Sequence, residues 1–236
     1  MNVFAISLGF MQFGIGMNSW SNTQPAFKVY FGWTDSQETT NGDILQSIII
    51  LGAAVGALSC AKFLAIGKYR LLLILNIVLC IGVGITLVGK YVWLMCIGRF
   101  IWGLSFGAFS VVSAKMVNEI VPVELGGSYG AMNQMSLCFG AALPGTMALA
   151  YPINFDNFTK DDFYVDQYFR YIWMLPLVVS ALQVLLLLTC FRNETPVYLK
   201  EKGRDEELLA VMKKYYSGME VRKRLDAMGG DENEGN

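Results

Sequence analysis

The sequence predicts an all-α membrane protein, with six transmembrane helices followed by a cytoplasmic amphipathic helix. Hydrophobic residues make up 54% of its 236 residues and charged residues only 16%, whereas a soluble domain has about 25% charged residues. Of the 18 basic and 19 acidic residues, 19 lie from Arg192 onward. We therefore expect residues 1–191 to form a transmembrane bundle, and residues 192–236 to form a cytoplasmic linker helix with a disordered polar tail.

Six stretches have the length and composition of membrane-spanning helices. A helix needs about 20 mostly apolar residues to cross a hydrocarbon core of about 30 Å. The six stretches are 3–26, 44–66, 71–89, 92–115, 128–151 and 171–191. The first is the most polar, because amides and hydroxyls crowd its second half from Asn18 to Gln24. Since lipid cannot satisfy such groups, we expect this half to face protein or a water-filled cavity.

The basic residues near the span ends predict that both termini are cytoplasmic. With that orientation the cytoplasmic side receives Lys62, Lys68, Arg70, Lys115, Arg192, Lys200, Lys202 and Arg204. The opposite side receives only Lys28, Lys90, Lys160 and Arg170. The loop between the fifth and sixth spans would then lie outside, where Asn157 in Asn157-Phe158-Thr159 is a candidate glycosylation site. A plasma membrane and an organelle membrane both remain open.

Composition argues against several classes of function. A net charge of −1 without a basic cluster argues against nucleic-acid binding. The chain has no histidine, and its five cysteines lie scattered in apolar runs, so we expect no metal site and no cofactor. No catalytic motif and no pair of carboxylates lies within the spans, so we expect that the protein is not an enzyme.

Two charged residues of the fourth span need an explanation. Arg99 lies near its outer end, and a charged side chain at mid-membrane costs about 3 kcal/mol. Pairing, lining a water path and snorkelling to the interface are all compatible with that position. Glu119 follows the inner end of the span, where it would form an interhelical ion pair or be solvated.

Adjacent amides in the fifth span indicate a binding cavity. Asn133 and Gln134 lie about a third of the way into an otherwise apolar helix. They serve either as helix–helix contacts or as hydrogen-bonding groups in a central cavity. We favour the cavity, because the polar half of the first span needs one too. The candidate ligand-binding residues are Gln134, Asn133, Asn18, Ser21 and Asn22. Amides and hydroxyls without carboxylates suit a neutral, hydroxyl-rich ligand.

Glycines recur at helical spacing in several spans. The pairs four residues apart are Gly52 and Gly56, Gly103 and Gly107, and Gly126 and Gly130. In lipid such pairs allow two backbones to approach closely, so packing is the favoured interpretation. Spans one and four also share glycines five residues apart, at Gly9 and Gly14 and at Gly98 and Gly103, which hints at a three-plus-three repeat.

Taken together, these motifs resemble the sugar-porter branch of the major facilitator superfamily. The matching residues are Gly98-Arg99, Glu119, Pro122, Gly127, Gln134 and Gly140, with a degraded linker motif from Glu194 to Leu199. The resemblance implies the N-terminal six-helix half of that fold, with its three-plus-three repeat. It implies that Gln134 hydrogen-bonds a sugar, and that Arg99, Glu119, Lys68 and Glu194 act in gating or ion pairing.

The chain departs from the family pattern at the cytoplasmic gate and in the first span. Gly126 and Val197 stand where the family has arginines, which implies either a weakened inner gate or a protein that no longer cycles normally. Gly16 stands where proton-coupled members carry an aspartate, so we expect any transport to be facilitative rather than proton-coupled.

The leading hypothesis is a facilitative hexose-like sugar transporter, or the N-terminal half of one. Its expected partners are the lipid bilayer, a neutral sugar and a second six-helix half, which would be the same chain continued, a second copy or another subunit. The alternative is a non-transporting membrane subunit or scaffold that keeps the half-fold. An ion channel is disfavoured, because no ring of charged residues lines the spans.

Overall fold

A computed structural model describes residues 2–121, 125–152, 158–190 and 194–215, and these residues contain helices but no strand. The candidate glycosylation site Asn157 lies outside the described residues, as does the tail from residue 216 onward that we expect to be disordered. The chain divides into two compact units, Met1–Arg192 and Asn193–Asn236.

Six long helices form the first unit. They are α1 (Asn2–Phe31), α2 (Asp35–Phe63), α3 (Lys68–Val88), α4 (Val92–Ile120), α5 (Gly126–Ala148) and α6 (Phe169–Cys190). Each covers most of one stretch that the sequence predicts to span the membrane. Among the described residues, four segments are long and apolar enough to cross a membrane: Asp35–Ile66, Lys68–Val88, Val92–Ile120 and Tyr164–Thr189. They correspond to α2, α3, α4 and α6, whereas α1 and α5 contain no apolar stretch of that length.

Hydroxyls in the polar half of α1 are satisfied by the backbone of the same helix. Ser19 Oγ donates to Ile15 O, and Thr23 Oγ1 donates to Ser19 O, each one turn back. Such bonds satisfy hydroxyls that would otherwise be left unpaired in a helix interior. The helix continues past Pro25 to Phe31, about a turn beyond the predicted end of the span at residue 26.

A capping box fixes the turn between α1 and α2. Thr34 Oγ1 accepts from the Gln37 backbone N–H, and the Gln37 side chain accepts from the Thr34 backbone N–H. Lys28 at the end of α1 reaches two acids of the first turn of α2, Asp35 and Glu38. The hydrogen bond to Asp35, followed by the bond to Glu38, raises the pKa of Lys28. These contacts fix the connection between the two helices.

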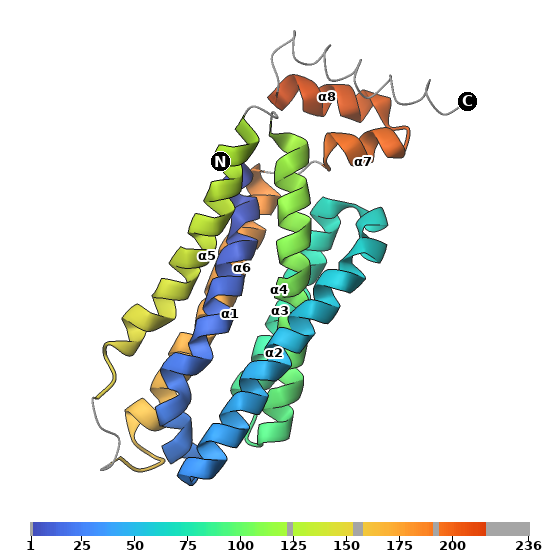
Figure 1. The fold of residues 1–236 in the computed structure, drawn as a ribbon. Coiled ribbons are helices and arrows are strands. Elements are labelled where there is room, and N and C mark those ends of the chain that lie inside the picture. The colour runs from blue at the N-terminus through green and yellow to red at the C-terminus, as the bar shows by residue number, and fades with distance from the viewer. Residues whose placement is uncertain (1, 122–124, 153–157, 191–193, 216–236) are drawn as a thin grey trace. The chain divides into compact units, whose positions relative to one another are not determined.

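The six helices pack as two interlocked groups of three. α1 packs along α5 and α6, while α4 packs along α2 and α3. The groups meet where α1 crosses α4 and where α3 contacts α6. Figure 1 shows α1 beside α5 and α2 beside α4, with α3 and α6 running behind. The two groups have the same arrangement, in which α1 corresponds to α4, α5 to α2 and α6 to α3.

Close glycine contacts show that this repeat extends to single residues. A Cβ added at Gly14 would lie 2.1 Å from Leu137 O and 2.7 Å from Ala141 N. One added at Gly103 would lie 2.3 Å from Ile49 O and 3.1 Å from Ala53 N. Positions 137 and 141 therefore correspond to 49 and 53, which is an offset of 88 residues between α2 and α5. The internal repeat hinted at by the glycine spacing is present in the packing.

In the described part of the second unit, residues 194–215, the helices are α7 (Pro196–Glu201) and α8 (Asp205–Tyr215). Gly203 joins them with a φ of 66°, a left-handed conformation that favours glycine. The acids Asp205, Glu206 and Glu207 occupy the first turn of α8, as the helix dipole favours. Along α8 the buried side chains are Leu208, Val211 and Met212, which gives this helix one apolar face.

Candidate functional site

The predicted polar residues of α1 lie just past the middle of the helix, in the half that leads to α2. Asn18 Nδ2 donates to Ala141 O of α5 at 3.0 Å, and this contact joins the two helices. Asn22 Nδ2 donates to Asn18 O one turn back at 2.8 Å. The side chain of Ser21 is exposed. Asn18 therefore contacts a neighbouring helix, Asn22 bonds to its own helix, and Ser21 has an exposed side chain.

The two adjacent amides of α5 have different surroundings. Asn133 is 6% exposed, and its Oδ1 accepts a 2.7 Å hydrogen bond from Ser7 Oγ of α1. Gln134 is exposed, and its Nε2 lies 3.9 Å from Cys138 Sγ on the same helix. A contact of that length to sulfur is weak, so nearly all of the hydrogen-bonding capacity of Gln134 is available to a ligand. Asn133 is committed to joining α5 to α1.

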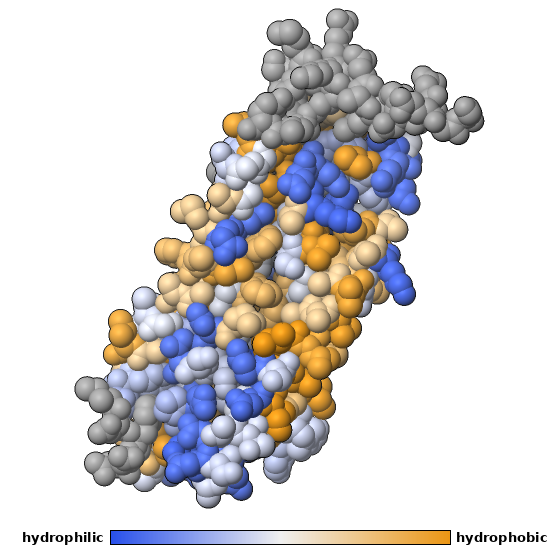
Figure 2. Space-filling model, viewed as in Figure 1, coloured by the Kyte–Doolittle hydropathy of each residue, from blue (hydrophilic) through white to orange (hydrophobic). Residues whose placement is uncertain are grey.

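The predicted binding residues occupy two levels along α1 rather than one. Asn133 lies at the level of Ser7, to which it is bonded. Asn18 is 11 residues further along α1, which is about 16 Å at 1.5 Å per residue. The structure thus brings Asn133 and Gln134 together at one level, and Asn18, Ser21 and Asn22 at another. Hydrophilic side chains gather on the lower half of the face in Figure 2, over the lower parts of α1 and α2.

Arg99 does not snorkel to the interface but is fully buried inside the bundle. Its Nε donates to Leu45 O at 2.8 Å, and its Nη2 donates to Gln46 Oε1 at 3.4 Å. The rings of Trp20, Trp102 and Trp173 surround its guanidinium, with centroids 5.5, 5.8 and 5.3 Å from Cζ. Aromatic faces and neutral oxygens therefore stabilise the charge. We call these three tryptophans the Arg99 cage.

We expect Arg99→Lys to lower the melting temperature of the protein by about 4–8 °C, which corresponds to about 2 kcal/mol. A lysine ammonium cannot stack on three indoles, nor present a flat fork to Leu45 O and Gln46 together. Thermal unfolding in detergent, followed by tryptophan emission, measures the change. Lys115→Arg, at an exposed position of α4, is the control and should leave the melting temperature unchanged. An unchanged value for Arg99→Lys would show that the cage contributes no stability.

Lys68 and Glu119 form an ion pair between the start of α3 and the end of α4. The Lys68 Nζ to Glu119 Oε1 distance is 2.8 Å, and the two side chains are 8% and 19% exposed. The alternative that Glu119 is simply solvated is therefore wrong. Helix α4 continues to Ile120, so that Glu119 lies on the helix rather than beyond it. The predicted gating residue Glu194 belongs to the second unit, where it is buried, and the gating roles of all four residues stay predictions.

A double-mutant cycle with Lys68→Ala and Glu119→Ala should give a coupling energy between about 0.5 and 3 kcal/mol. The pair is largely shielded from water, so it should exceed the small value typical of an exposed pair. The cycle subtracts the contacts that each residue makes elsewhere. Unfolding of the four variants in mixed micelles provides the measurement, and additive effects would show that the pair is not coupled.

Sequence reasoning missed a buried polar network that joins α1, α3 and α6. Gln12 Nε2 donates to Gln183 Oε1 at 2.9 Å and to Asn76 Oδ1 at 3.3 Å. Ser180 Oγ donates to the same Asn76 oxygen at 2.6 Å. The network fixes three helices in one register, as interhelical hydrogen bonds do in lipid. Isolated polar residues in three separate apolar stretches were its only signal in the sequence.

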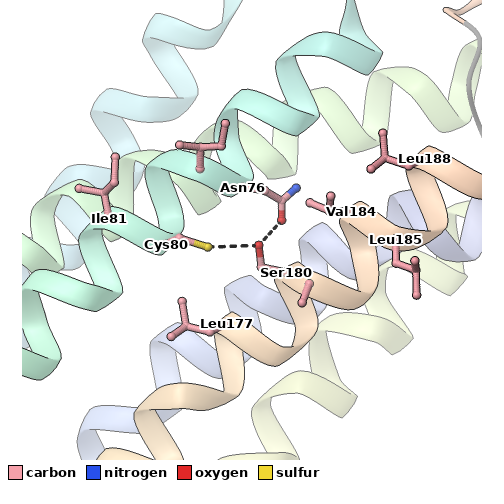
Figure 3. A pocket seen from close by; sticks show the side chains of 10 residues that line it. Asn76, Cys80, Ile81, Leu177, Ser180, Val184, Leu185 and Leu188 are labelled. Carbon is pink, nitrogen blue, oxygen red and sulfur yellow. Dashed lines mark hydrogen bonds between the residues drawn. The ribbon is translucent and has the colours of Figure 1, made fainter.

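A cavity of about 670 Å³ lies between α3 and α6, away from the amides of α5. Figure 3 shows Asn76, Ser180 and Cys80 joined by hydrogen bonds, among aliphatic side chains such as Ile81 and Leu185. The polar groups in this cavity bond mainly to one another and to the network of Gln12. We therefore attribute these polar groups to contacts between α1, α3 and α6, and contact between Gln134 and a ligand stays a prediction.

Comparison with known proteins identifies a family. The family model described as "Sugar (and other) transporter" matches residues 1–233. A relative named Hexose transporter 1 from Plasmodium knowlesi is 25% identical over 97% of this chain and 47% of its own length. The glucose transporter GlcP of Staphylococcus epidermidis is 32% identical over 80% of this chain and 40% of its own. The chain thus spans about half the length of the curated relatives it matches.

Solved structures with the same fold are also found. A structure of the proton:xylose symporter XylE bound to 6-bromo-6-deoxy-D-glucose has a TM-score of 0.81 at 18% identity, and the match covers 95% of this chain and 51% of that one. A partially occluded inward-open structure of XylE from E. coli has a TM-score of 0.83 at 17% identity, covering 99% and 59%. The helices described above therefore have the fold of about half of this transporter.

Proposed function

Because this chain belongs to the sugar transporter family of the major facilitator superfamily, we propose that it moves a neutral, hexose-like sugar across a membrane. The observation that carries the proposal is the exposed amide of Gln134, whose one contact is weak. A carboxamide both donates and accepts, so it matches the alternating donors and acceptors of a sugar's hydroxyl groups. The relatives named as hexose and glucose transporters support the same class of substrate.

We infer that transport is facilitative. The α1 sequence contains no acidic residue, and the acceptors of Arg99 hydrogen bonds are the neutral oxygens of Leu45 and Gln46. Groups that do not titrate cannot carry a proton through the bundle. The XylE relatives are described as proton symporters, so this chain would differ from them in its energy source.

We also infer that all six long helices cross the membrane, with both termini cytoplasmic. The surplus of basic residues at the ends of α2, α3 and α4 supports this orientation. α1 and α5 lack the long apolar stretch that the other four contain, and exposed polar side chains such as Ser21 and Gln134 suit contact with a second six-helix half. The sugar would then lie between the two halves, near the middle of the bilayer.

Uptake of labelled D-glucose into liposomes tests the proposed function. The natively assembled protein that contains this chain is reconstituted, and uptake is measured against sugar concentration. We expect saturable uptake that unlabelled D-glucose inhibits and unlabelled L-glucose does not. Collapse of an imposed pH gradient should leave the rate unchanged. Uptake that is not saturable would overturn the proposal, and uptake driven by the pH gradient would overturn its facilitative part.

The alternative is a membrane subunit that keeps the half-fold without transporting. It is favoured by the loss of gate charges, since Gly126 stands where family members carry an arginine. Purification in mild detergent discriminates between the two. A stable complex with unrelated subunits that shows no sugar binding supports the scaffold, whereas a protein that binds glucose supports the transporter.

A further inference from the structure

The internal repeat gives Gln134 a structural counterpart. Positions 137 and 141 of α5 face Gly14 as positions 49 and 53 of α2 face Gly103. The same offset of 88 residues relates position 134 to position 46, and both positions are glutamine. The two side chains therefore leave equivalent points on equivalent helices.

Both amides are held by weak contacts. Gln46 Nε2 donates to Met17 O at 3.4 Å, and its Oε1 accepts from Arg99 Nη2 at 3.4 Å. These distances exceed the usual 2.9–3.0 Å for N–H···O bonds. Gln46 is partly exposed, so its two long bonds can be exchanged for bonds to a hydroxyl-rich ligand, while the three indole rings still surround the Arg99 guanidinium. In the same way, among the residues that the structure describes, the side chain of Gln134 would lose only its 3.9 Å contact to Cys138 Sγ.

The two glutamines lie at opposite levels of the bundle. The neighbour of Gln134, Asn133, bonds to Ser7, whereas Gln46 bonds to Met17. Ten residues of α1 separate these levels, or about 15 Å along the axis. In the orientation proposed above, Gln46 lies in the outer half of the membrane and Gln134 in the inner half. The exposed hydroxyl of Ser21 lies one turn beyond Met17 on α1.

We propose that Gln46 is a second sugar-contacting amide, which serves the outer half of the pathway as Gln134 serves the inner half. Its carboxamide takes a pair of neighbouring hydroxyls on the sugar, and Ser21 offers a third hydrogen-bonding group. Arg99 Nη2 returns to Gln46 Oε1 when the sugar leaves. The inference rests on the proposed function and adds to it a residue that determines affinity from one side of the membrane.

Transport measured from each side of the membrane tests this role. We expect Gln46→Leu to raise the half-saturation concentration for D-glucose about tenfold from the outer side and less than twofold from the inner side. Gln134→Leu should show the larger effect from the inner side. Ser47→Ala is the control, because it changes an exposed side chain beside Gln46. Melting temperatures are recorded for all variants, since a purely structural role would lower stability without distinguishing the two sides.

The outcomes separate the inference from the proposed function. If the unaltered protein shows saturable transport and Gln46→Leu leaves both half-saturation values unchanged, the second amide is overturned and the function stands. Equal increases from both sides, accompanied by a lower melting temperature, would also overturn it by making Gln46 structural. If the unaltered protein shows no saturable transport, the proposed function is overturned and the inference with it.

Discussion

Gln134→Leu should weaken sugar transport about ten- to hundredfold, measured as the ratio of maximal rate to half-saturation concentration. The change replaces an amide with an apolar side chain of similar size, and it removes two hydrogen bonds that we assign to the sugar. Each neutral hydrogen bond contributes about 0.5–1.5 kcal/mol, and a tenfold change corresponds to about 1.4 kcal/mol. The fold should persist, because Gln134 is exposed and makes one weak contact within its own helix.

Two neighbouring variants control for indirect effects of that change. Cys138→Ala removes the one contact of Gln134, so transport should stay within twofold of the unaltered value. Ser7→Ala removes the 2.7 Å bond to Asn133, so it should lower the melting temperature more than it alters transport. Unchanged transport by Gln134→Leu, with normal stability, would exclude contact between this amide and the sugar.

The positions of the six long helices were predictable, because a stretch of consecutive apolar residues can be recognised in the sequence without knowing its neighbours in space. All six predicted stretches contain a long helix, and the break at Gly67, with a φ of 110°, separates α2 from α3. The ends were less predictable. α1 continues past Pro25 and α4 continues to Ile120, since neither the proline nor the polar residues near these ends break the helix.

Which side chains contact one another depends on the rotation of each helix relative to its neighbours, and a single sequence does not show that rotation. Three tryptophans from α1, α4 and α6 surround the Arg99 guanidinium, and only Trp102 is close to Arg99 in sequence. Gln12 bonds to residues 64 and 171 positions away. A lone polar residue in an apolar stretch indicates only that a partner exists.

Among the predicted binding residues, too, some features were predictable from the sequence and others depend on how the helices pack. The neighbouring amides of α5 were recognisable from sequence, because two adjacent amides in an apolar helix are unusual. Asn133 bonds to Ser7 whereas Gln134 is exposed, because the two side chains point in different directions from the helix. Gln46 was not recognisable, because the offset that relates it to Gln134 comes from contacts between backbones.

Gly107→Ala should destabilise the bundle by about 3 kcal/mol, which lowers the melting temperature by about 6–12 °C. A Cβ at this position would lie 2.0 Å from Ala53 O and 2.6 Å from Ala53 Cα. Because those atoms belong to the backbone, α2 and α4 must move apart along their whole contact. Loss of close packing is costly in lipid, where no hydrophobic drive holds two helices together.

Gly84→Ala is the matched control for Gly107→Ala, because it adds the same methyl group to α3 with no atom within 4 Å of it. Alanine is the better helix former by about 1 kcal/mol, so this variant should match or exceed the stability of the unaltered protein. If Gly107→Ala lowers the stability and Gly84→Ala does not, the loss arises from the contact between α2 and α4 and not from the added methyl group itself. Equal losses would instead indicate a general requirement for glycine, and would show that the close contact between the backbones of α2 and α4 contributes no stability of its own.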